Sequence, residues 1–312
     1  MNLLDNNGTT VTEFFLIGFQ VNKCLRLFLF CLLLVASFAT ICGNLLIIVL
    51  VSTSRSLHTP MYFFISQLSA NDILLTTDIA PNMLNILLNN GGTITFSNCI
   101  TQLYFFCASE TFECLLLTVM SYDRYLAICN PLRYTSIMTH VHCVKLLVIC
   151  WLIGFSIILT DILTISRLQF CKSNIIDHFF CDLVPLQEIS CSDTSVVQLE
   201  IFLLSIPSVV IPTIIIIASY ARILISILKI SSSIGRHKAF STCSSHLIVV
   251  SIFYWTLFSV YVFPTKGGAS SMNKIFSLLY TVFTPLINPI IYSLRNKDIR
   301  QAMNKIVKKS FT

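Results

Sequence analysis

Four of the acidic residues within the apolar stretches of this chain stand out, and their positions indicate what chemistry it can perform. Asp72, Glu110 and Glu113 stand among apolar residues, and Asp123 directly precedes Arg124. A carboxylate in an apolar setting must be protonated, paired or bound to a cation. Glu110 and Glu113 are three residues apart and therefore share one side of a helix. The pattern leaves these three states open for Asp72, Glu110 and Glu113 and indicates a charge pair at Asp123 and Arg124. It lacks the nucleophile–base pair or metal cluster of an enzyme.

The composition of the whole chain places these residues in a membrane. The chain has 312 residues, of which 55% are hydrophobic and only 11% charged, and its mean hydropathy is +0.82. A soluble domain has about 25% charged residues. Disordered, collagen-like and nucleic-acid-binding proteins are excluded because each needs many polar or charged residues. The 13 cysteines are too scattered for a small disulfide scaffold.

Long helices are needed to position the acidic residues. A helix that crosses the hydrocarbon core of a bilayer needs roughly 20 mostly apolar residues. Seven stretches meet that length: 27–51, 60–88, 99–128, 141–163, 197–225, 239–263 and 275–294. We therefore predict an all-α membrane protein. It comprises an extracellular N-terminus (1–26), a seven-transmembrane-helix bundle (27–294), and a cytoplasmic amphipathic helix and tail (295–312).

Basic residues predict the orientation of the bundle. Fourteen of the 20 Lys and Arg residues lie at one set of span ends: Arg55, Arg124, Arg133, Lys145, Arg222, Lys229, Arg236, Lys238, Arg295, Lys297, Arg300, Lys305, Lys308 and Lys309. The positive-inside rule makes this side cytoplasmic. We expect a plasma-membrane protein with its N-terminus outside and no cleavable signal peptide. The sequon at Asn7 then lies where glycosylation occurs.

The residues after the seventh stretch form an eighth, interfacial helix in this prediction. Apolar residues recur at helical spacing and basic residues take the other side: Ile299, Met303, Ile306 and Val307 against Arg300, Lys305, Lys308 and Lys309. Such a helix lies on the inner leaflet and is attracted to anionic lipid. The alternative is a frayed basic tail.

Four cysteines lie on the predicted outer side, where disulfides persist. Cys99 opens the third span, and Cys171, Cys181 and Cys191 lie in the loop after the fourth span. Four cysteines allow three pairings. Of these we expect Cys99–Cys181, which would fix the loop to the third span as a lid, and Cys171–Cys191, which would close a loop within it.

Several motifs occur in order along the chain, each on its expected span. They are Gly43-Asn44, 57–64 (LHTPMYFF), 68–72 (LSAND), 120–132 (MSYDRYLAICNPL), 178–182 (HFFCD), 238–247 (KAFSTCSSHL) and 285–293 (PLINPIIYS). The Asp-Arg-Tyr and Asn-Pro-x-x-Tyr motifs resemble those of rhodopsin-like (class A) G-protein-coupled receptors. Four stretches resemble specifically the odorant (olfactory) receptors: 57–64, the Ser-Tyr-Asp-Arg-Tyr stretch within 120–132, 178–182 and the start of 238–247. The resemblance covers nearly the whole chain.

The resemblance implies a function and a set of switch residues. An odorant receptor binds small organic odorants and activates a heterotrimeric stimulatory, olfactory-type G protein to raise cyclic AMP, and it often needs an accessory trafficking protein. The arginine of the third span is held in the resting state and released on activation. The residues implied in this switch are Asp123, Arg124, Tyr125, Tyr220, Asn288, Pro289 and Tyr292. The prolines Pro207, Pro212, Pro285 and Pro289 either permit bending or make static kinks.

The resemblance also implies where the ligand binds, which is between the third, fifth, sixth and seventh spans, under the lid. Carrying the family positions across gives Cys107, Glu110, Thr111, Leu204, Ser205, Ser208, Tyr254, Leu257, Phe258, Tyr261 and Thr281, with Leu183 closing the pocket from the lid. Such sites are mostly apolar with a few placed polar groups.

Two residues depart from the family pattern. Glu110 replaces a small residue, and we hypothesise that it favours amine ligands; the alternative is a protonated or internally hydrogen-bonded Glu110. Trp255 replaces the usual glycine, and it either narrows the interface of the sixth and seventh spans or faces lipid.

Two further sets of residues suggest ion binding. By resemblance Asp72 and Glu113, with Asn44 and Asn288, form a polar core that can hold a sodium ion; alternatively one carboxyl of the coupled pair is protonated. No other cofactor is expected. Cys243 and His246 have the spacing of zinc ligands, but two ligands do not make a zinc site, and we expect ordinary packing there.

Features of the sequence argue against two other functions. A rhodopsin-like receptor for a peptide or a lipid shares the architecture, but the loop and the sixth-span motif argue against it. A channel or transporter would show charges or broken helices along a pathway, and usually internal repeats. The sequence shows neither pattern.

Overall fold

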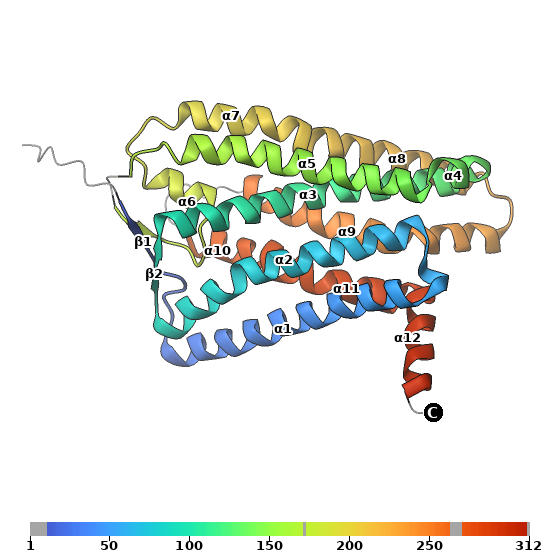
Figure 1. Ribbon diagram of the computed structural model, residues 1–312, viewed down its shortest axis with the longest axis horizontal. Helices are drawn as coiled ribbons and strands as arrows, with labels where there is room; N and C mark the ends of the chain where they lie inside the picture. The colour runs from blue at the N-terminus through green and yellow to red at the C-terminus, as the bar shows by residue number, and fades with distance from the viewer. Residues whose placement is uncertain (1–10, 171–172, 263–269, 311–312) are drawn as a thin grey trace, which may run out of the picture.

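The computed structural model describes residues 11–170, 173–262 and 270–310. Long helices run side by side along its longest dimension (Figure 1). Those that span the bundle are α1 (Lys23–Thr53), α2 (Pro60–Asn89), α3 (Phe96–Cys129), α5 (His140–Ile165), α7 (Ser195–Ser205) continued by η2 (Ile206–Val210) and α8 (Ile211–Leu228), α9 (Ser233–Val262), and α10 (Ser270–Leu278) continued by η3 (Leu279–Phe283) and α11 (Thr284–Arg295). The all-α, seven-helix prediction is confirmed.

The long helices differ in how apolar their sequences are. Five described stretches are long and apolar enough to cross a membrane: Lys23–Thr53, Phe96–Cys129, His140–Ile165, Ser195–Leu228 and Met272–Leu294. Helix α2 is as long but more polar, and α9 has a shorter apolar stretch at Cys243–Ser259. The polar residues of α2 point inward, because Asn71 and Asp72 are both completely buried.

The distribution of side chains is that of a protein surrounded by lipid. Large apolar residues lie on the outer surface, where Val35 of α1 is 66% exposed and Phe38 is 70% exposed. Polar residues such as Asn44 of the same helix are buried inside. A soluble fold has the opposite arrangement. The structure therefore agrees with a multi-pass membrane protein.

Two helices contain wide turns next to prolines. In η2 and η3 the last hydrogen bond reaches back five residues, from the Ile211 N–H to the Ile206 carbonyl and from the Thr284 N–H to the Leu279 carbonyl. Pro212 and Pro285 follow directly, and a proline cannot donate the ordinary helical hydrogen bond. A π-turn accommodates that missing donor and often occurs at functional sites.

Short helices connect the long ones at the end of the bundle where α12 (Lys297–Ser310) lies, here called the α12 end. They are η1 (Arg55–Leu57) and α4 (Pro131–Ile137). Helix α12 turns sharply away from α11 (Figure 1). Its Ile299 and Ala302 are buried, whereas Arg300 and Lys305 are exposed. The predicted eighth helix is thus confirmed, although the side chains of 306–310 lie outside the description.

A small sheet at the opposite end, here called the sheet end, was not predicted. Its strands are β1 (Glu13–Leu16), β2 (Gly92–Thr95) and β3 (Ile175–Ile176), in the order β2-β1-β3. Strand β1 pairs antiparallel with β2 and parallel with β3. Its alternation buries Phe14 and Leu16, and the Phe14 ring lies 5.4 Å from that of Phe170. The sheet ties the N-terminal segment to two loops.

Candidate functional site

A disulfide fixes a lid over the sheet end of the bundle. The lid, defined here as residues 173–194, contains the short helix α6 (Leu183–Glu188). Cys181 of the lid is bonded to Cys99 at the start of α3, as expected. The backbone N–H of Cys181 also donates to Oε1 of Gln102 (3.1 Å), which is buried on α3. Cys191 is disulfide-bonded, but Cys171, its expected partner, lies outside the described residues.

The opposite edge of the lid is tied to α10 and η3. Lys274 is 4% exposed, and its Nζ donates to the Gly18 carbonyl (2.8 Å) and to Oδ1 of Asp177 (2.5 Å). One buried cation therefore joins the N-terminal segment and the lid to a membrane helix. The sequence analysis missed this residue, because a single Lys near a span end has no signal of burial.

Two further polar contacts join the lid to α10 and η3. Nε2 of His178 lies 3.1 Å from Oγ of Ser277. The Tyr280 hydroxyl donates to Oδ2 of Asp182 (3.3 Å), and Oδ1 of Asp182 accepts from the Leu183 N–H (2.7 Å). Burial raises the pKa of Asp182, while the backbone N–H of Leu183 and the Tyr280 hydroxyl oppose that rise.

His178 makes the stability of the lid depend on pH. Burial, and secondly the positive charge of Lys274, lower the pKa of His178 to about 3 from 6.5. Below about pH 6.5 His178 binds a proton in the unfolded chain but not in the folded chain. The contribution of neutral His178 to the free energy of unfolding is therefore full above pH 6.5 and is lost as the pH falls toward 3.

We expect the purified protein to lose about 2 kcal/mol of stability between about pH 6.5 and pH 5 through His178, at about 1.4 kcal/mol per pH unit. The measurement is the thermal midpoint of the wild type and of His178→Gln across this range. Asp177, Asp182 and Lys274 face the same region and stay in both proteins. The wild-type curve should fall more steeply, and parallel curves would contradict the assignment.

The predicted ligand-binding residues differ in burial, and most of those whose side chains are described lie at least partly inside the bundle, whereas Phe258 faces outward. Thr111, Ser208 and Thr281 are buried; Cys107, Glu110, Leu183, Leu204, Ser205, Tyr254 and Leu257 are partly buried; Phe258 is 63% exposed. The Tyr261 side chain lies outside the description. The hydroxyls of Ser208 and Thr281 donate to carbonyls of their own helices. The Tyr254 hydroxyl lies 3.1 Å from Sγ of Cys114, which links α9 to α3.

Glu110 has acidic neighbours, and none of the described basic residues forms an ion pair with it. It lies within electrostatic range of Glu113 on α3 and of Asp182 in the lid. The ion pairs between described residues are Arg124–Asp123 and Lys274–Asp177, so Glu110 is in neither. None of the hydrogen bonds between described residues involves its carboxyl group. Internal hydrogen bonding of Glu110, one expected alternative, is therefore not observed in this part of the chain.

Trp255 faces outward, which is one of the two alternatives expected for it. Its side chain is 60% exposed on α9, so it lies on the outer surface of the bundle rather than in an interface between helices. The position faces the surrounding lipid of a membrane protein.

The polar core lies deeper, between α1, α2, α3 and α11. Asp72, Glu113, Asn44 and Asn288 are each at most 3% exposed. Nδ2 of Asn288 donates to both carboxylate oxygens of Asp72 at 3.2 Å. Oε1 of Glu113 and Oδ1 of Asn44 are buried without a hydrogen-bond partner. These unsatisfied oxygens are of the type that hard cations prefer. Among the described residues there is no group of three His, Cys, Asp or Glu side chains suited to a metal.

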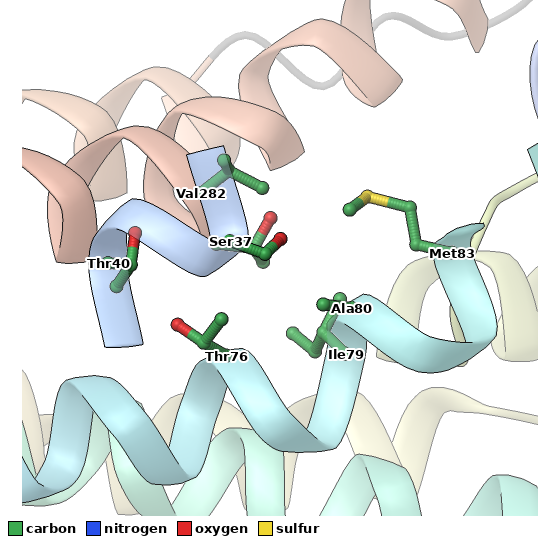
Figure 2. A pocket seen from close by; sticks show the side chains of 8 residues that line it. Ser37, Thr40, Thr76, Ile79, Ala80, Met83 and Val282 are labelled. Carbon is green, nitrogen blue, oxygen red and sulfur yellow. The ribbon is translucent and has the colours of Figure 1, made fainter. Parts of the chain in front are cut away.

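A narrow gap between α1, α2 and η3 has no room for a water molecule. Its polar lining consists of Ser37, Thr40 and Thr76, which are labelled in Figure 2, and of Thr281. Every one of these hydroxyls donates to a carbonyl of its own helix or segment. The space therefore has neither the room nor the free polar groups for a ligand.

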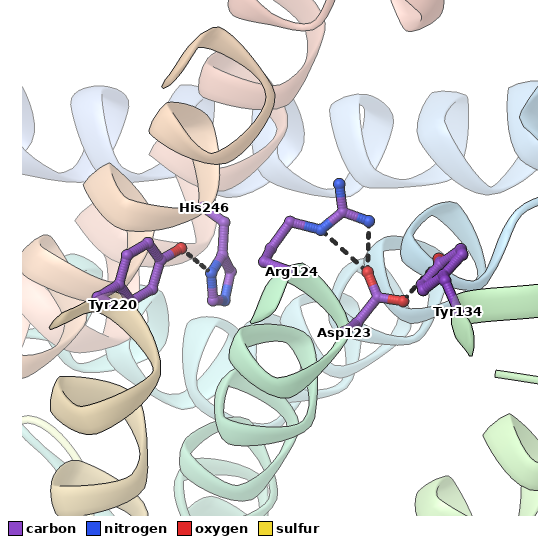
Figure 3. Close-up of polar contacts among 5 residues, drawn as sticks. All are labelled: Asp123, Arg124, Tyr134, Tyr220 and His246. Atoms are coloured by element: carbon purple, nitrogen blue, oxygen red, sulfur yellow. Dashed lines mark hydrogen bonds and ion pairs between the residues drawn. The ribbon is translucent and has the colours of Figure 1, made fainter. Parts of the chain in front are cut away.

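Arg124 is held by its neighbour at the α12 end. It forms an ion pair with Asp123, whose other oxygen accepts a hydrogen bond from the Tyr134 hydroxyl of α4 (2.8 Å; Figure 3). The Tyr220 hydroxyl lies 2.5 Å from Nδ1 of His246 and not on Arg124. The contact of His246 with Tyr220, together with Cys243 donating to the Ala239 carbonyl, agrees with ordinary packing rather than zinc binding.

Leu132 is a surface residue that the sequence analysis missed. It lies on α4 beside the Arg124 pair and is 97% exposed. A leucine in a short polar loop gives no signal by itself.

Comparison with known proteins gives one consistent result. A family described as "Olfactory receptor" matches residues 30–310. Olfactory receptor 5G9 of Mus musculus is 44% identical over 308 residues, covering 99% of this chain and 98% of the relative. Olfactory receptor 11L1 of Homo sapiens is 46% identical over 303 residues, covering 97% and 94%.

A solved structure shares the fold. The crystal structure of squid rhodopsin superposes with a TM-score of 0.75 at 17% identity, covering 94% of this chain and 88% of that one. At this identity the likeness concerns the arrangement of helices alone. It agrees with the bundle described above.

Proposed function

The chain belongs to the olfactory receptor family, and on that premise we propose that it binds a small organic odorant and activates a stimulatory, olfactory-type heterotrimeric G protein to raise cyclic AMP. As a member of this family it is a multi-pass membrane receptor and not an enzyme. The observation that carries the proposal is the family match over residues 30–310, which spans both the lid and the Arg124 pair. Ligand binding acts by favouring one of two arrangements of the bundle.

The proposed receptor lies in the plasma membrane with its α12 end in the cytoplasm. The basic residues that support this orientation include Arg55, Arg133 and Arg300. The N-terminus and the lid are then extracellular, which agrees with a disulfide in the lid. Glycosylation is proposed at Asn7, which lies outside the described residues. An accessory trafficking protein is proposed as a further partner.

The odorant site is proposed between α3, α7–η2–α8, α9 and α10–η3–α11, under the lid. Most of its candidate residues are at least partly buried. Glu110 is proposed to pair with a ligand ammonium group, since its carboxyl group has no counter-ion among the described residues. An uncompensated carboxylate in a largely apolar site favours a cation.

The polar core is proposed to hold a sodium ion. Oε1 of Glu113 and Oδ1 of Asn44, buried without partners, support this assignment together with the Asp72 carboxylate. Such an ion would compensate one of the two negative charges of Asp72 and Glu113 while the receptor rests. It supplies no chemistry beyond its charge.

The G protein is proposed to contact the α12 end at Arg124 and Leu132. Leu132→Asp is expected to lower the potency of G-protein activation about ten- to thirtyfold, because a fully exposed apolar anchor becomes charged. The measurement is nucleotide exchange on the G protein at equal receptor amounts. Ser136→Asp, which adds the same charge at another exposed site of α4, is the matched control. An equal loss in both variants would contradict a specific contact.

A cyclic-AMP reporter screen with a chemically broad odorant panel tests the function. Cells expressing the receptor, with its presence at the surface verified by antibody, should respond to at least one compound. Arg124→Ala at the same surface level should abolish that response. A complete absence of responses despite surface expression would count against the receptor assignment.

A further inference from the structure

A groove on the α12 end of the bundle has no role in the odorant site or the switch. It has a volume of about 560 Å³, within the range of about 300–1,000 Å³ common for ligand pockets. Twelve residues from α1, η1, α2 and α5 and from the joints beside them line it: Ile48, Val51, Ser52, Leu57, His58, Thr59, Pro60, Phe63, Ser66, Met138, His140 and Cys143. None of them is acidic.

The position of the groove determines what covers it. Ile48, Val51 and Phe63 lie within membrane-spanning helices, whereas His58 and His140 lie where those helices begin or end. The groove therefore crosses the boundary between acyl chains and headgroups. Apolar residues on the neighbouring surface are exposed, with Val49 at 50% and Val141 at 63%, as expected of a lipid contact. In a membrane the neighbour of this surface is lipid.

The polar residues of the groove lie together at its headgroup side. His58 and His140 are both exposed, and Arg55 on η1 is exposed three residues before His58. Nε2 of His58 is 3.4 Å from the Ser52 carbonyl. The His140 ring packs against Phe63 with centroids 5.9 Å apart, and none of the hydrogen bonds between described residues uses its nitrogens. Imidazole N–H groups and a guanidinium are donors suited to a phosphate.

We propose that this groove binds one anionic phospholipid of the cytoplasmic leaflet. The phosphate accepts hydrogen bonds from His58 and His140 with Arg55 nearby, and an acyl chain lies along Ile48, Val51 and Phe63. The cytoplasmic leaflet is rich in anionic lipid. The site is independent of which odorant the receptor binds.

The first experiment counts lipid retained by the full-length receptor. The receptor is reconstituted in nanodiscs of phosphatidylserine and phosphatidylcholine, and the lipids that stay bound are measured by native mass spectrometry. His58→Leu/His140→Leu should bind phosphatidylserine about tenfold more weakly than the wild type, the loss expected when hydrogen bonds to a charged group are removed. His142→Leu/His237→Leu, which makes the same change at two histidines that do not line the groove, should bind normally. Equal retention by the first variant and the wild type would overturn the proposal.

A second experiment uses the wild type alone, so that misfolding of a variant cannot obscure the result. A phosphatidylserine with a photoreactive acyl chain is cross-linked to the receptor, and the labelled peptides are mapped. Labelling near Phe63 and Cys143, competed by phosphatidylserine but not by phosphatidylcholine or cholesterol, supports the proposal. Labelling confined to other helices, or equal competition by a neutral lipid or a sterol, overturns it.

Discussion

Glu110→Gln is expected to lower the potency of amine odorants about ten- to a hundredfold, the loss of a hydrogen bond to a charged group, while neutral odorants change little. The amide keeps the size of the side chain but carries no negative charge to form an ion pair with an ammonium group. Glu110 has no described counter-ion, and its electrostatic neighbours Glu113 and Asp182 are acidic. A cationic ligand would therefore enter a site that repels anions.

The measurement is a set of cyclic-AMP dose–response curves with amines and with neutral odorants of matching shape. Glu200→Gln, an acid on α7 outside the predicted site, is the matched control and should leave both potencies unchanged. An unchanged amine response in Glu110→Gln would exclude pairing with a ligand and leave the protonated carboxyl group as the explanation.

Breaking the disulfide is expected to cost about 4–5 kcal/mol, the chain-entropy value for a closed loop of 82 residues. Proteins are stable by only about 5–15 kcal/mol, so Cys99→Ser or Cys181→Ser should greatly reduce the folded receptor at the cell surface. The lost stability also has a structural cause. The disulfide fixes the lid, and His178 and Asp182 of the lid contact α10 and η3.

Surface labelling and the thermal midpoint of the purified protein check this prediction. The double variant Cys99→Ser/Cys181→Ser should lose about as much as either single variant, because all three remove the same bond. Cys24→Ser, at an exposed free thiol of α1, should behave like the wild type. Normal surface levels and midpoints in the disulfide variants would contradict the role given to the lid.

The sequence was sufficient for features that repeat over many residues or rest on a recognised motif. Seven long stretches predicted seven spanning helices, and the alternation of apolar and basic residues predicted α12. The Cys99–Cys181 bond was chosen among three pairings and is present. Most predicted ligand-binding residues lie at least partly inside the bundle, and their roles stay predictions.

Features formed by a few residues that are distant in sequence could not be predicted from the sequence. Strand β1 has four residues, and it exists because β2 and β3 supply backbone partners. Lys274 is buried because Gly18 and Asp177 meet it there, more than 90 residues away. The exposure of Leu132 depends on how α4 lies beside α3. Each depends on tertiary packing, which no local pattern encodes.

Ligand-dependent nucleotide exchange tests the central claim most directly. The purified receptor in nanodiscs is mixed with a stimulatory heterotrimeric G protein, and exchange is followed while an odorant active in the cell screen is added. We predict that the odorant accelerates exchange by the wild type, and that Arg124→Ala still binds the odorant but does not accelerate exchange. Odorant binding by the wild type without any acceleration, or a ligand-gated current without the G protein, would contradict the account.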